Sequence, residues 1–215
     1  MVPLVNRRCG GSIPYVPSSR HRQKRQAVTT EQRPLRADAQ RNLERITASA
    51  QVLFAERGTR AQMEDIAAHA GVGIGTLYRR FPTKEALITA LVRQRFQEFA
   101  AIAAECEHIT DPYEALATSM RRQAESIEGD AAFQLAMMNI DNFSWDGIDE
   151  DKSALNAILS RIIERAQAAG AVRADLGVED YGMMMCGTTA TMYFMHGEHG
   201  WQRHLDLVLA GLKPS

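Results

Sequence analysis

The sequence predicts an all-α protein, and three observations lead to this prediction. Apolar residues recur at spacings of three and four, which place them on one helix face, over nearly the whole chain after residue 37. No segment shows sustained alternation of apolar and polar residues between turn-forming residues, as a half-buried strand would. The chain has 215 residues, 45% hydrophobic and 24% charged, which is ordinary for a globular protein with a sizeable core. We expect about nine helices.

The first 37 residues are expected to lack a fold. They contain four of the seven prolines, and eight Lys and Arg against one acidic residue. No apolar period runs through them, so the segment offers little burial to offset the entropy of ordering it. It is either a basic arm that contacts phosphates or an extension from a start codon assigned too far upstream. The sequence leaves both interpretations open.

The first helix is predicted over residues 38–57. Apolar residues from Leu43 to Phe54 follow the helical spacing and supply one buried face. Asp38 is expected to be the N-cap, because its side chain can accept a hydrogen bond from the first turn. Gly58 is expected to be the C-terminal cap, because glycine adopts the left-handed conformation that ends many helices.

Two short helices are predicted next, over residues 63–70 and 74–81, joined by the turn Gly71-Val72-Gly73. Two short helices that flank a three-residue turn containing glycine form a helix-turn-helix. A glycine in the turn permits a positive φ angle, which other residues resist. Pro82 stops the second helix, and Thr83 caps a fourth helix that we expect to continue to about residue 105.

Five further helices are expected in the remainder of the chain. Asp111 and Pro112 mark a strong start, because Asp caps a helix and Pro fits its first turn. A long helix through Leu155 is expected to end at Gly170, after a loop over residues 142–149. The other helices are predicted at 131–140, 178–195 and 201–212.

Residues 43–84 resemble the TetR-type transcriptional regulators. The resemblance rests on Asp65-Ile66-Ala67, on Ala70-Gly71-Val72 and on GTLYRRFPTKEAL, which runs from Gly75 to Leu87. The piece AQVLFAERG at residues 50–58 fits the first helix of the same family. A weaker similarity, AGAVRAD at residues 169–175, matches the linker before its last two long helices.

The resemblance implies a three-helix DNA-binding domain at residues 38–84, linked through the helix 83–105 to a ligand-binding and dimerisation domain at 85–215. Members of the family form two-fold dimers whose recognition helices, here 74–80, enter successive major grooves of a palindromic operator. By this resemblance Tyr78 and Lys84 contact phosphates, and Arg79 reads guanine. The full set of expected DNA-binding residues is Gln62, Glu64, Ile74, Gly75, Thr76, Tyr78, Arg79, Arg80 and Lys84.

This sequence departs from the common pattern of the family at two places. Arg80 stands where a histidine is usual, so the positive charge at that position does not depend on pH. Gly73, Ile74 and Gly75 leave the tip of the recognition helix without hydrogen-bonding side chains. We therefore expect base readout to depend on Arg79 and Thr76, on apolar contact from Ile74, and on the shape of the DNA.

The charge distribution agrees with a DNA-binding front half. The formal net charge is −1, but residues 1–96 hold seventeen Lys and Arg against seven acidic residues. Residues 97–215 hold eight Lys and Arg against nineteen acidic residues. An asymmetry of this kind is typical of a protein whose first part binds a polyanion.

The acidic half is expected to hold an effector cavity and the dimer interface, again by resemblance to the family. Methionines suit an adaptable apolar pocket, so the effector is expected to be a hydrophobic small molecule, although ordinary filling of the core is the alternative role for at least half of them. The pocket residues are predicted to be Met120, Phe133, Met137, Trp145, Met184 and Tyr193. The dimer interface is predicted to use Met192, Met195, Trp201, Leu205, Val208, Leu209 and Leu212.

The sequence as a whole predicts a dimeric, ligand-responsive DNA-binding regulator of the cytoplasm, most simply a repressor. A helical scaffold with only non-specific DNA binding and a transcriptional activator are the alternatives. No phosphate loop, nucleophile elbow or metal dyad suggests an enzyme or a cofactor. His196, His199 and His204 are close in sequence, but neighbouring glycines argue against a metal site. No apolar stretch is long enough to span a membrane.

Overall fold

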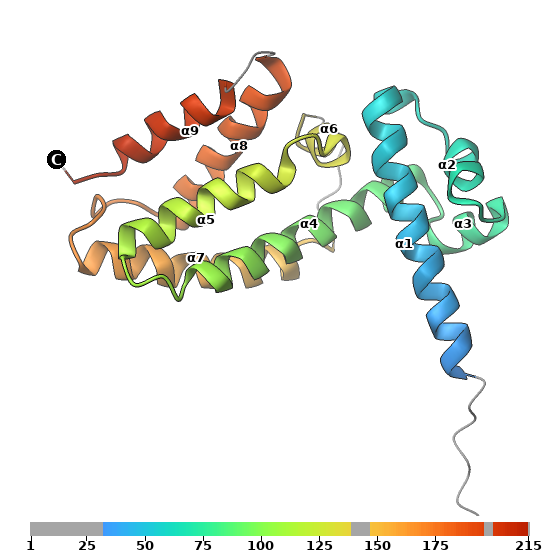
Figure 1. Cartoon of the computed structure of the whole chain (residues 1–215), viewed down its shortest axis with the longest axis horizontal. Helices are drawn as coiled ribbons and strands as arrows, with labels where there is room; N and C mark the ends of the chain where they lie inside the picture. The colour runs from blue at the N-terminus through green and yellow to red at the C-terminus, as the bar shows by residue number, and fades with distance from the viewer. Residues whose placement is uncertain (1–31, 139–146, 196–199, 215) are drawn as a thin grey trace, which may run out of the picture.

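The computed structural model describes residues 32–138, 147–195 and 200–214. Over these ranges it contains nine α-helices, one short 3₁₀ helix and no strand, which confirms the predicted all-α class (Figure 1). The elements are α1 (Gln32–Arg57), η1 (Gly58–Arg60), α2 (Met63–Ala70), α3 (Ile74–Arg80), α4 (Lys84–Cys106), α5 (Pro112–Ile127), α6 (Ala131–Met138), α7 (Asp149–Ala168), α8 (Val178–Phe194) and α9 (Gly200–Gly211).

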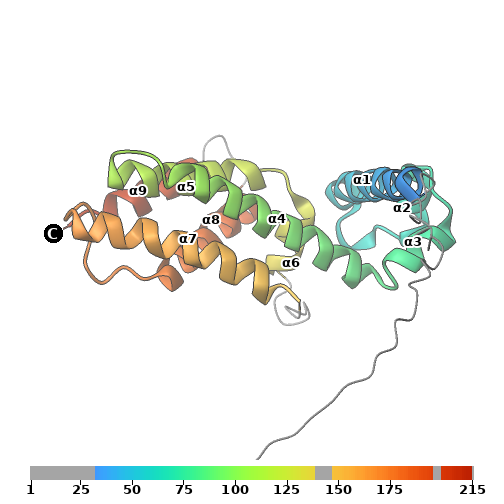
Figure 2. The same cartoon turned by 90° about the horizontal axis from the view of Figure 1, so that it is seen from below.

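The helices form two groups along the length of an elongated molecule. Helices α1, α2 and α3 lie at one end, and α5, α7, α8 and α9 form a bundle at the other (Figures 1 and 2). The long helix α4 leads from the first group into the bundle and packs against both α5 and α7. The N-terminal group is therefore placed relative to the bundle mainly through α4.

Local chemistry explains where several helices begin and end. Gly58 has φ 57° directly after α1, as expected for a left-handed cap. The hydroxyl of Thr83 accepts a hydrogen bond from the backbone N–H of Ala86 and caps α4. The carboxylate of Asp111 accepts hydrogen bonds from two N–H groups in the first turn of α5, which begins at Pro112. These three caps confirm the sequence predictions.

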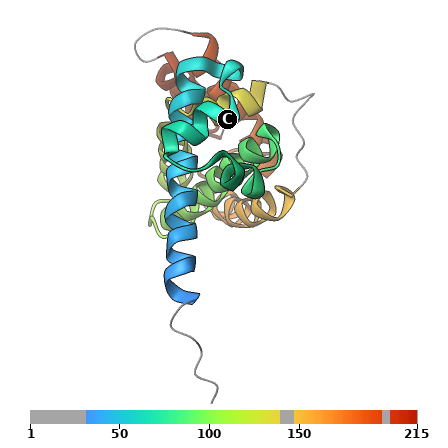
Figure 3. The ribbon, with the colours of Figure 1, turned by 90° about the vertical axis from the view of Figure 1, so that its right-hand side faces the viewer.

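Helix α1 begins earlier than predicted. It starts at Gln32, so Asp38 lies inside the helix and is not its N-cap, and residues 32–37 are helical. Pro34 is the third residue of the helix. A proline in the first turn costs no hydrogen bond, because the N–H groups of that turn have no partner within the helix. The first turns of α1 extend away from the other helices (Figure 3).

Two hydrophobic cores correspond to the two groups of helices. The N-terminal core joins α1, α2, α3 and the start of α4, and the second core fills the bundle. Large side chains buried in the first are Ile46, Phe54, Ile66, Leu77 and Leu87. Large side chains buried in the second are Leu116, Met120, Ile127, Leu159, Ile162 and Leu205.

The short helix α6 contributes to both cores. Ala132 is fully buried in the N-terminal core, while the next residue, Phe133, is buried in the bundle core. The ring of Phe133 makes an edge contact with Phe99 of α4, with centroids 5.6 Å apart. Because its two faces belong to different cores, α6 is a second connection between the two groups of helices.

No helix in the described ranges is both long and apolar enough to cross a membrane.

Candidate nucleic-acid interface

The turn between α2 and α3 is held by three hydrogen bonds. Gly71 has φ 62° and donates its N–H to the carbonyl of Ala68, and Val72 donates to the carbonyl of Ala67. Arg45 of α1 donates from Nη2 to the carbonyl of Gly71 at 2.7 Å. The turn is therefore fixed both to the helix that it ends and to α1, which sets the direction of α3.

One face of α3 is buried and the other is open to solvent. Leu77 is completely buried in the N-terminal core, and Phe81 follows the helix into the same core. Outside this core, Ile74 and Tyr78 of the same helix are 41% and 40% exposed, large fractions for such bulky side chains. A short helix that is anchored on one side and exposed on the other has the form needed to enter a major groove.

The tip of α3 presents backbone more than side chain. Gly73 is the N-cap of α3, in an extended conformation, and its carbonyl accepts hydrogen bonds from the N–H groups of Thr76 and Leu77. A Cβ added at Gly75 would meet no atom within 4 Å. Thr76 is half-buried at the same end of the helix. The main chain here can approach another molecule closely, as the bare tip in the sequence suggests.

Tyr78 and Glu64 form a direct contact across the helix-turn-helix. The Tyr78 hydroxyl donates to Oε1 of Glu64 at 3.0 Å, and both side chains are exposed. This hydrogen bond, together with desolvation and the negative charge of Glu64, raises the pKa of Tyr78 above its ordinary value. A tyrosine hydroxyl is already protonated at neutral pH, and the raised pKa of Tyr78 keeps it a hydrogen-bond donor further into the alkaline range.

Lys84 lies at the start of α4 and is half-buried. Its Nζ donates to the backbone carbonyl of Thr59 in η1 and lies 5.9 Å from the centre of the Phe54 ring. These contacts hold the ammonium group beside the first turn of α4. A helix N-terminus and a lysine placed together make a favourable environment for a phosphate.

The remaining predicted DNA-binding residues are exposed on the same domain. Gln62 precedes α2, and its side-chain amide donates to the carbonyl of Arg60 at 3.2 Å. Arg79 and Arg80 are exposed at the end of α3, and the guanidinium of Arg80 lies 5.7 Å from the centre of the Phe81 ring. Sequence reasoning missed Arg45, because its partner is a backbone carbonyl 26 positions away.

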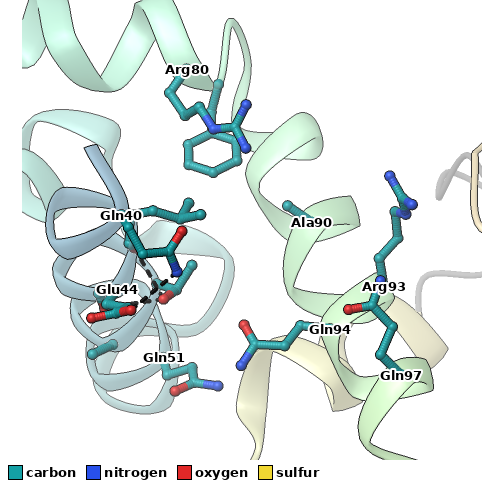
Figure 4. Close-up of a pocket in the computed structure, with 12 residues that line it drawn as sticks. Gln40, Glu44, Gln51, Arg80, Ala90, Arg93, Gln94 and Gln97 are labelled. Atoms are coloured by element: carbon teal, nitrogen blue, oxygen red, sulfur yellow. Dashed lines mark hydrogen bonds between the residues drawn. The ribbon is translucent and has the colours of Figure 1, made fainter. Parts of the chain in front are cut away.

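A cavity of about 670 Å³ lies between α1 and α4, beside the end of α3 (Figure 4). Its lining includes Gln40, Glu44 and Gln51 from α1, with Arg80 near one end. None of the predicted effector residues lines it. The cavity therefore does not correspond to the effector pocket expected in the acidic half.

The structure brings together four of the predicted effector residues. Met120 and Phe133 are buried in the bundle core, and Met137 and Met184 pack against it. Tyr193 is 40% exposed near the end of α8, where its ring contacts Phe194 instead. Trp145 lies outside the described residues.

The predicted dimer stripe on the last helix packs mainly inward within a single protomer. Four of its members, Trp201, Leu205, Leu209 and Leu212, are buried in the core of their own protomer. Val208 packs against the same core. Met192 is also packed against this core, whereas Met195 is 64% exposed. An amphipathic stripe indicates that one face of a helix packs against something. Here that face of α9 packs against the other helices of its own bundle.

The fold and the exposed face of α3 together define a helix-turn-helix DNA-binding protein with a separate helical domain. A family model described as "Bacterial regulatory proteins, tetR family" matches residues 46–91. A second model, described as "Transcriptional regulator SbtR-like, C-terminal domain", matches residues 111–214. No curated protein sequence matches the chain.

Solved structures lead to the same family. The TetR transcriptional regulator SCO0520 from Streptomyces coelicolor is 32% identical, over 80% of this chain and 99% of that chain, with a TM-score of 0.59. A TetR transcription regulatory protein from Mycobacterium vanbaalenii is 31% identical, over 84% of this chain and 100% of that chain, with a TM-score of 0.60. This chain belongs to the TetR family of transcriptional regulators.

A more distant neighbour shares the fold alone. The transcriptional regulator FadR from Bacillus subtilis, solved in complex with stearoyl-CoA, is 20% identical. The similarity covers 79% of this chain and 98% of that chain, with a TM-score of 0.64.

Proposed function

We propose that this protein is a dimeric repressor that binds a palindromic operator and leaves it when a hydrophobic small molecule binds. The observation that carries the proposal is the exposed face of α3. Leu77 anchors the helix in the N-terminal core while Tyr78 and Arg79 remain on the surface. Tyr78 and Lys84 contact phosphates in this proposal, and Arg79 reads guanine O6 and N7 through two hydrogen bonds.

Exposed apolar surface on the last two helices supports two-fold pairing. Because the predicted stripe on α9 is largely buried in its own protomer, exposed residues beside it would contribute most of the contact area. Large apolar side chains that remain exposed on or next to α8 and α9 are Met183, Tyr193, Phe194, Met195 and Leu207. Exposed apolar surface of this kind is typical of a partner interface. Paired recognition helices would lie about 34–36 Å apart, one turn of B-DNA.

Release by an effector requires a physical path from the bundle to α3, and α6 supports one. Phe133 of α6 lies in the bundle core, beside the predicted pocket residues, and Ala132 lies in the N-terminal core. A ligand that displaces the Phe133 face therefore moves the face that carries Ala132. The ligand shifts DNA affinity only by the difference in its affinity for the two arrangements. The stearoyl-CoA complex of FadR supports a long apolar molecule as one effector class to test.

The test is selection of bound fragments from random DNA by the purified full-length protein, at a fixed salt concentration of about 150 mM. The expected result is an enriched palindrome whose half-sites are one helical turn apart. Recovery of DNA without any shared motif would contradict a sequence-specific regulator. That result would favour a scaffold that binds DNA through charge alone, an alternative suggested by the bare tip at Gly73 and Gly75. Once a motif is known, fluorescence anisotropy with candidate acyl ligands tests release.

A further inference from the structure

Glu64 is the one carboxylate of the helix-turn-helix that remains free of an ion pair among the described residues. It is the second residue of α2, and its neighbours Met63 and Ile66 turn into the core while Glu64 stays exposed. The next acid, Asp65, is paired with Arg57, whose Nη1 lies 2.5 Å from Oδ2. The negative charge of Asp65 is therefore compensated within the protein, and that of Glu64 is not.

The hydrogen bond from Tyr78 places the Glu64 carboxylate beside the exposed face of α3. The hydroxyl of Tyr78 lies 3.0 Å from Glu64 Oε1, so the carboxylate is next to the surface that meets DNA in the proposed function. A tyrosine hydroxyl has a single hydrogen to donate. When Tyr78 donates to a phosphate, Glu64 loses its only hydrogen-bond donor in the described structure.

A free carboxylate in the major groove is stabilised by only some base edges. Guanine presents two acceptors there, and thymine presents an acceptor and a methyl group, so both leave the charge without a donor. Cytosine presents an amino donor at N4, the group that Glu and Asp accept from in known complexes. Adenine presents a donor beside an acceptor, which suits a carboxamide better than a carboxylate.

We propose that Glu64 is a specificity-determining residue that accepts a hydrogen bond from a cytosine N4 amino group in each half-site. The inference rests on the proposed function and names one contact within it. It assigns to α2 part of the readout that the tip of α3 does not supply. At that tip, Gly73 and Gly75 have no side chain to donate or accept.

The test compares motifs selected from random DNA by the full-length protein and by three variants. Glu64→Ala removes the acceptor, and Glu64→Gln replaces it with a carboxamide of the same size. The matched control is Glu125→Ala, which removes the same charge from an exposed position on α5. Glu64 is exposed and, within the part of the chain that the structure describes, its side chain hydrogen-bonds only to Tyr78. Each variant should therefore fold, which circular dichroism and the melting temperature verify.

The expected result is a change at one position of each half-site. Glu64→Ala should lower the preference for cytosine there roughly fivefold, since a single hydrogen bond to N4 falls at the lower end of the discrimination that bidentate contacts to bases give. Glu64→Gln should shift the preference toward adenine, and Glu125→Ala should leave the motif unchanged. An unchanged motif for Glu64→Ala, with tighter binding to all DNA, would show that Glu64 only repels phosphates and would overturn the assignment. Failure of the wild type to select any motif would instead refute the proposed function, and the assignment with it.

Discussion

Arg95 of α4 donates two hydrogen bonds to a single carboxylate oxygen of Asp130, from Nε at 2.9 Å and from Nη2 at 2.6 Å. The other oxygen of Asp130 accepts from the backbone N–H of Phe133 and caps α6. The side chains of Arg95 and Asp130 are only 12% and 8% exposed. One aspartate thus begins α6 and fixes it to α4, the helix that joins the two cores.

Asp130→Ala should lower the free energy of unfolding by about 3 kcal/mol, because it leaves a largely buried arginine with fewer partners and removes a helix cap. Asp130→Asn is the matched control, since Asn caps a helix but carries no charge. It should restore about 1 kcal/mol of that loss. Urea denaturation followed by circular dichroism measures both values. Equal stability of Asp130→Ala and wild type would show that the pair does not hold α6 in place.

Gly71 and Gly75 should respond in opposite ways to alanine. Gly71 has φ 62°, so Gly71→Ala should destabilise the protein by about 1–2 kcal/mol through backbone strain. Gly75 lies inside α3 with open space around it, so Gly75→Ala should stabilise by roughly 0.5–1 kcal/mol. Denaturation midpoints report both effects. If Gly75→Ala binds operator as tightly as wild type, the backbone at the tip does not approach the DNA closely.

Tyr78 and Lys84 should differ in the salt dependence of their contributions to DNA binding. Lys84→Met keeps an unbranched side chain of similar length at this half-buried position but removes the charge and the hydrogen bond to Thr59. The slope of log affinity against log salt should become shallower by about 1 for each phosphate that the variant no longer neutralises. Tyr78→Phe removes a neutral hydrogen bond, so it should weaken binding without changing the slope. Anisotropy titrations at several salt concentrations separate the two cases, and an unchanged slope for Lys84→Met would refute its phosphate contact.

Acid should remove a contribution that Glu107 makes to stability. Arg161 donates two hydrogen bonds to Glu107, and these hold the pKa of Glu107 below its usual value. A pKa lowered by folding stabilises the protein above the unfolded-state value of about 4.3, and this stabilisation is lost as the pH falls. At pH 7 the free energy of unfolding of wild type should therefore exceed that of Glu107→Gln by less than about 1 kcal/mol, since the pair is only partly buried and solvent screens it. The free energies of unfolding of wild type and Glu107→Gln, measured by urea titration, should converge near pH 3.

Removal of residues 1–31 should weaken DNA binding most at low salt. The segment carries six Lys and Arg and one Glu, and attraction between exposed charges and phosphates is screened by salt. The deletion ends just before α1 begins, so the melting temperature should remain that of the full chain. A loss of affinity that is equal at about 50 mM and 300 mM salt would exclude an electrostatic role for the segment.

Sequence predicted the features that depend on neighbours along the chain. The caps at Thr83 and Asp111 and the left-handed Gly71 were predictable, because each satisfies backbone groups within a few residues. Pro34 misled the prediction for α1, since a proline suggests disorder but is tolerated in a first turn. The packing of α9 against its own bundle was not predictable, because an apolar stripe such as that around Leu205 does not indicate which surface it packs against.

The remaining features that the sequence did not predict are contacts between residues far apart in the chain. Sequence identified Glu64 and Tyr78 separately as DNA-binding candidates, but their hydrogen bond joins residues 14 positions apart on different helices. The hydrogen bond from Arg45 to Gly71 spans 26 positions and involves only a main-chain carbonyl of the glycine. No local pattern marks such a pairing. The DNA-contacting roles of these side chains remain predictions for the experiments above.

Helix α6 contributes side chains to both hydrophobic cores, and this limits how the regulator can be re-engineered. A biosensor designer would splice chimaeras between the two matched regions, after residue 91 and before residue 111. That cut assigns Ala132 and its neighbour Leu135 to the exchanged part, although both pack in the N-terminal core. A transplanted sensing domain would bring foreign side chains into the DNA-binding module and leave it poorly packed. A functional hybrid therefore needs this protein's own α6 face grafted onto the incoming domain.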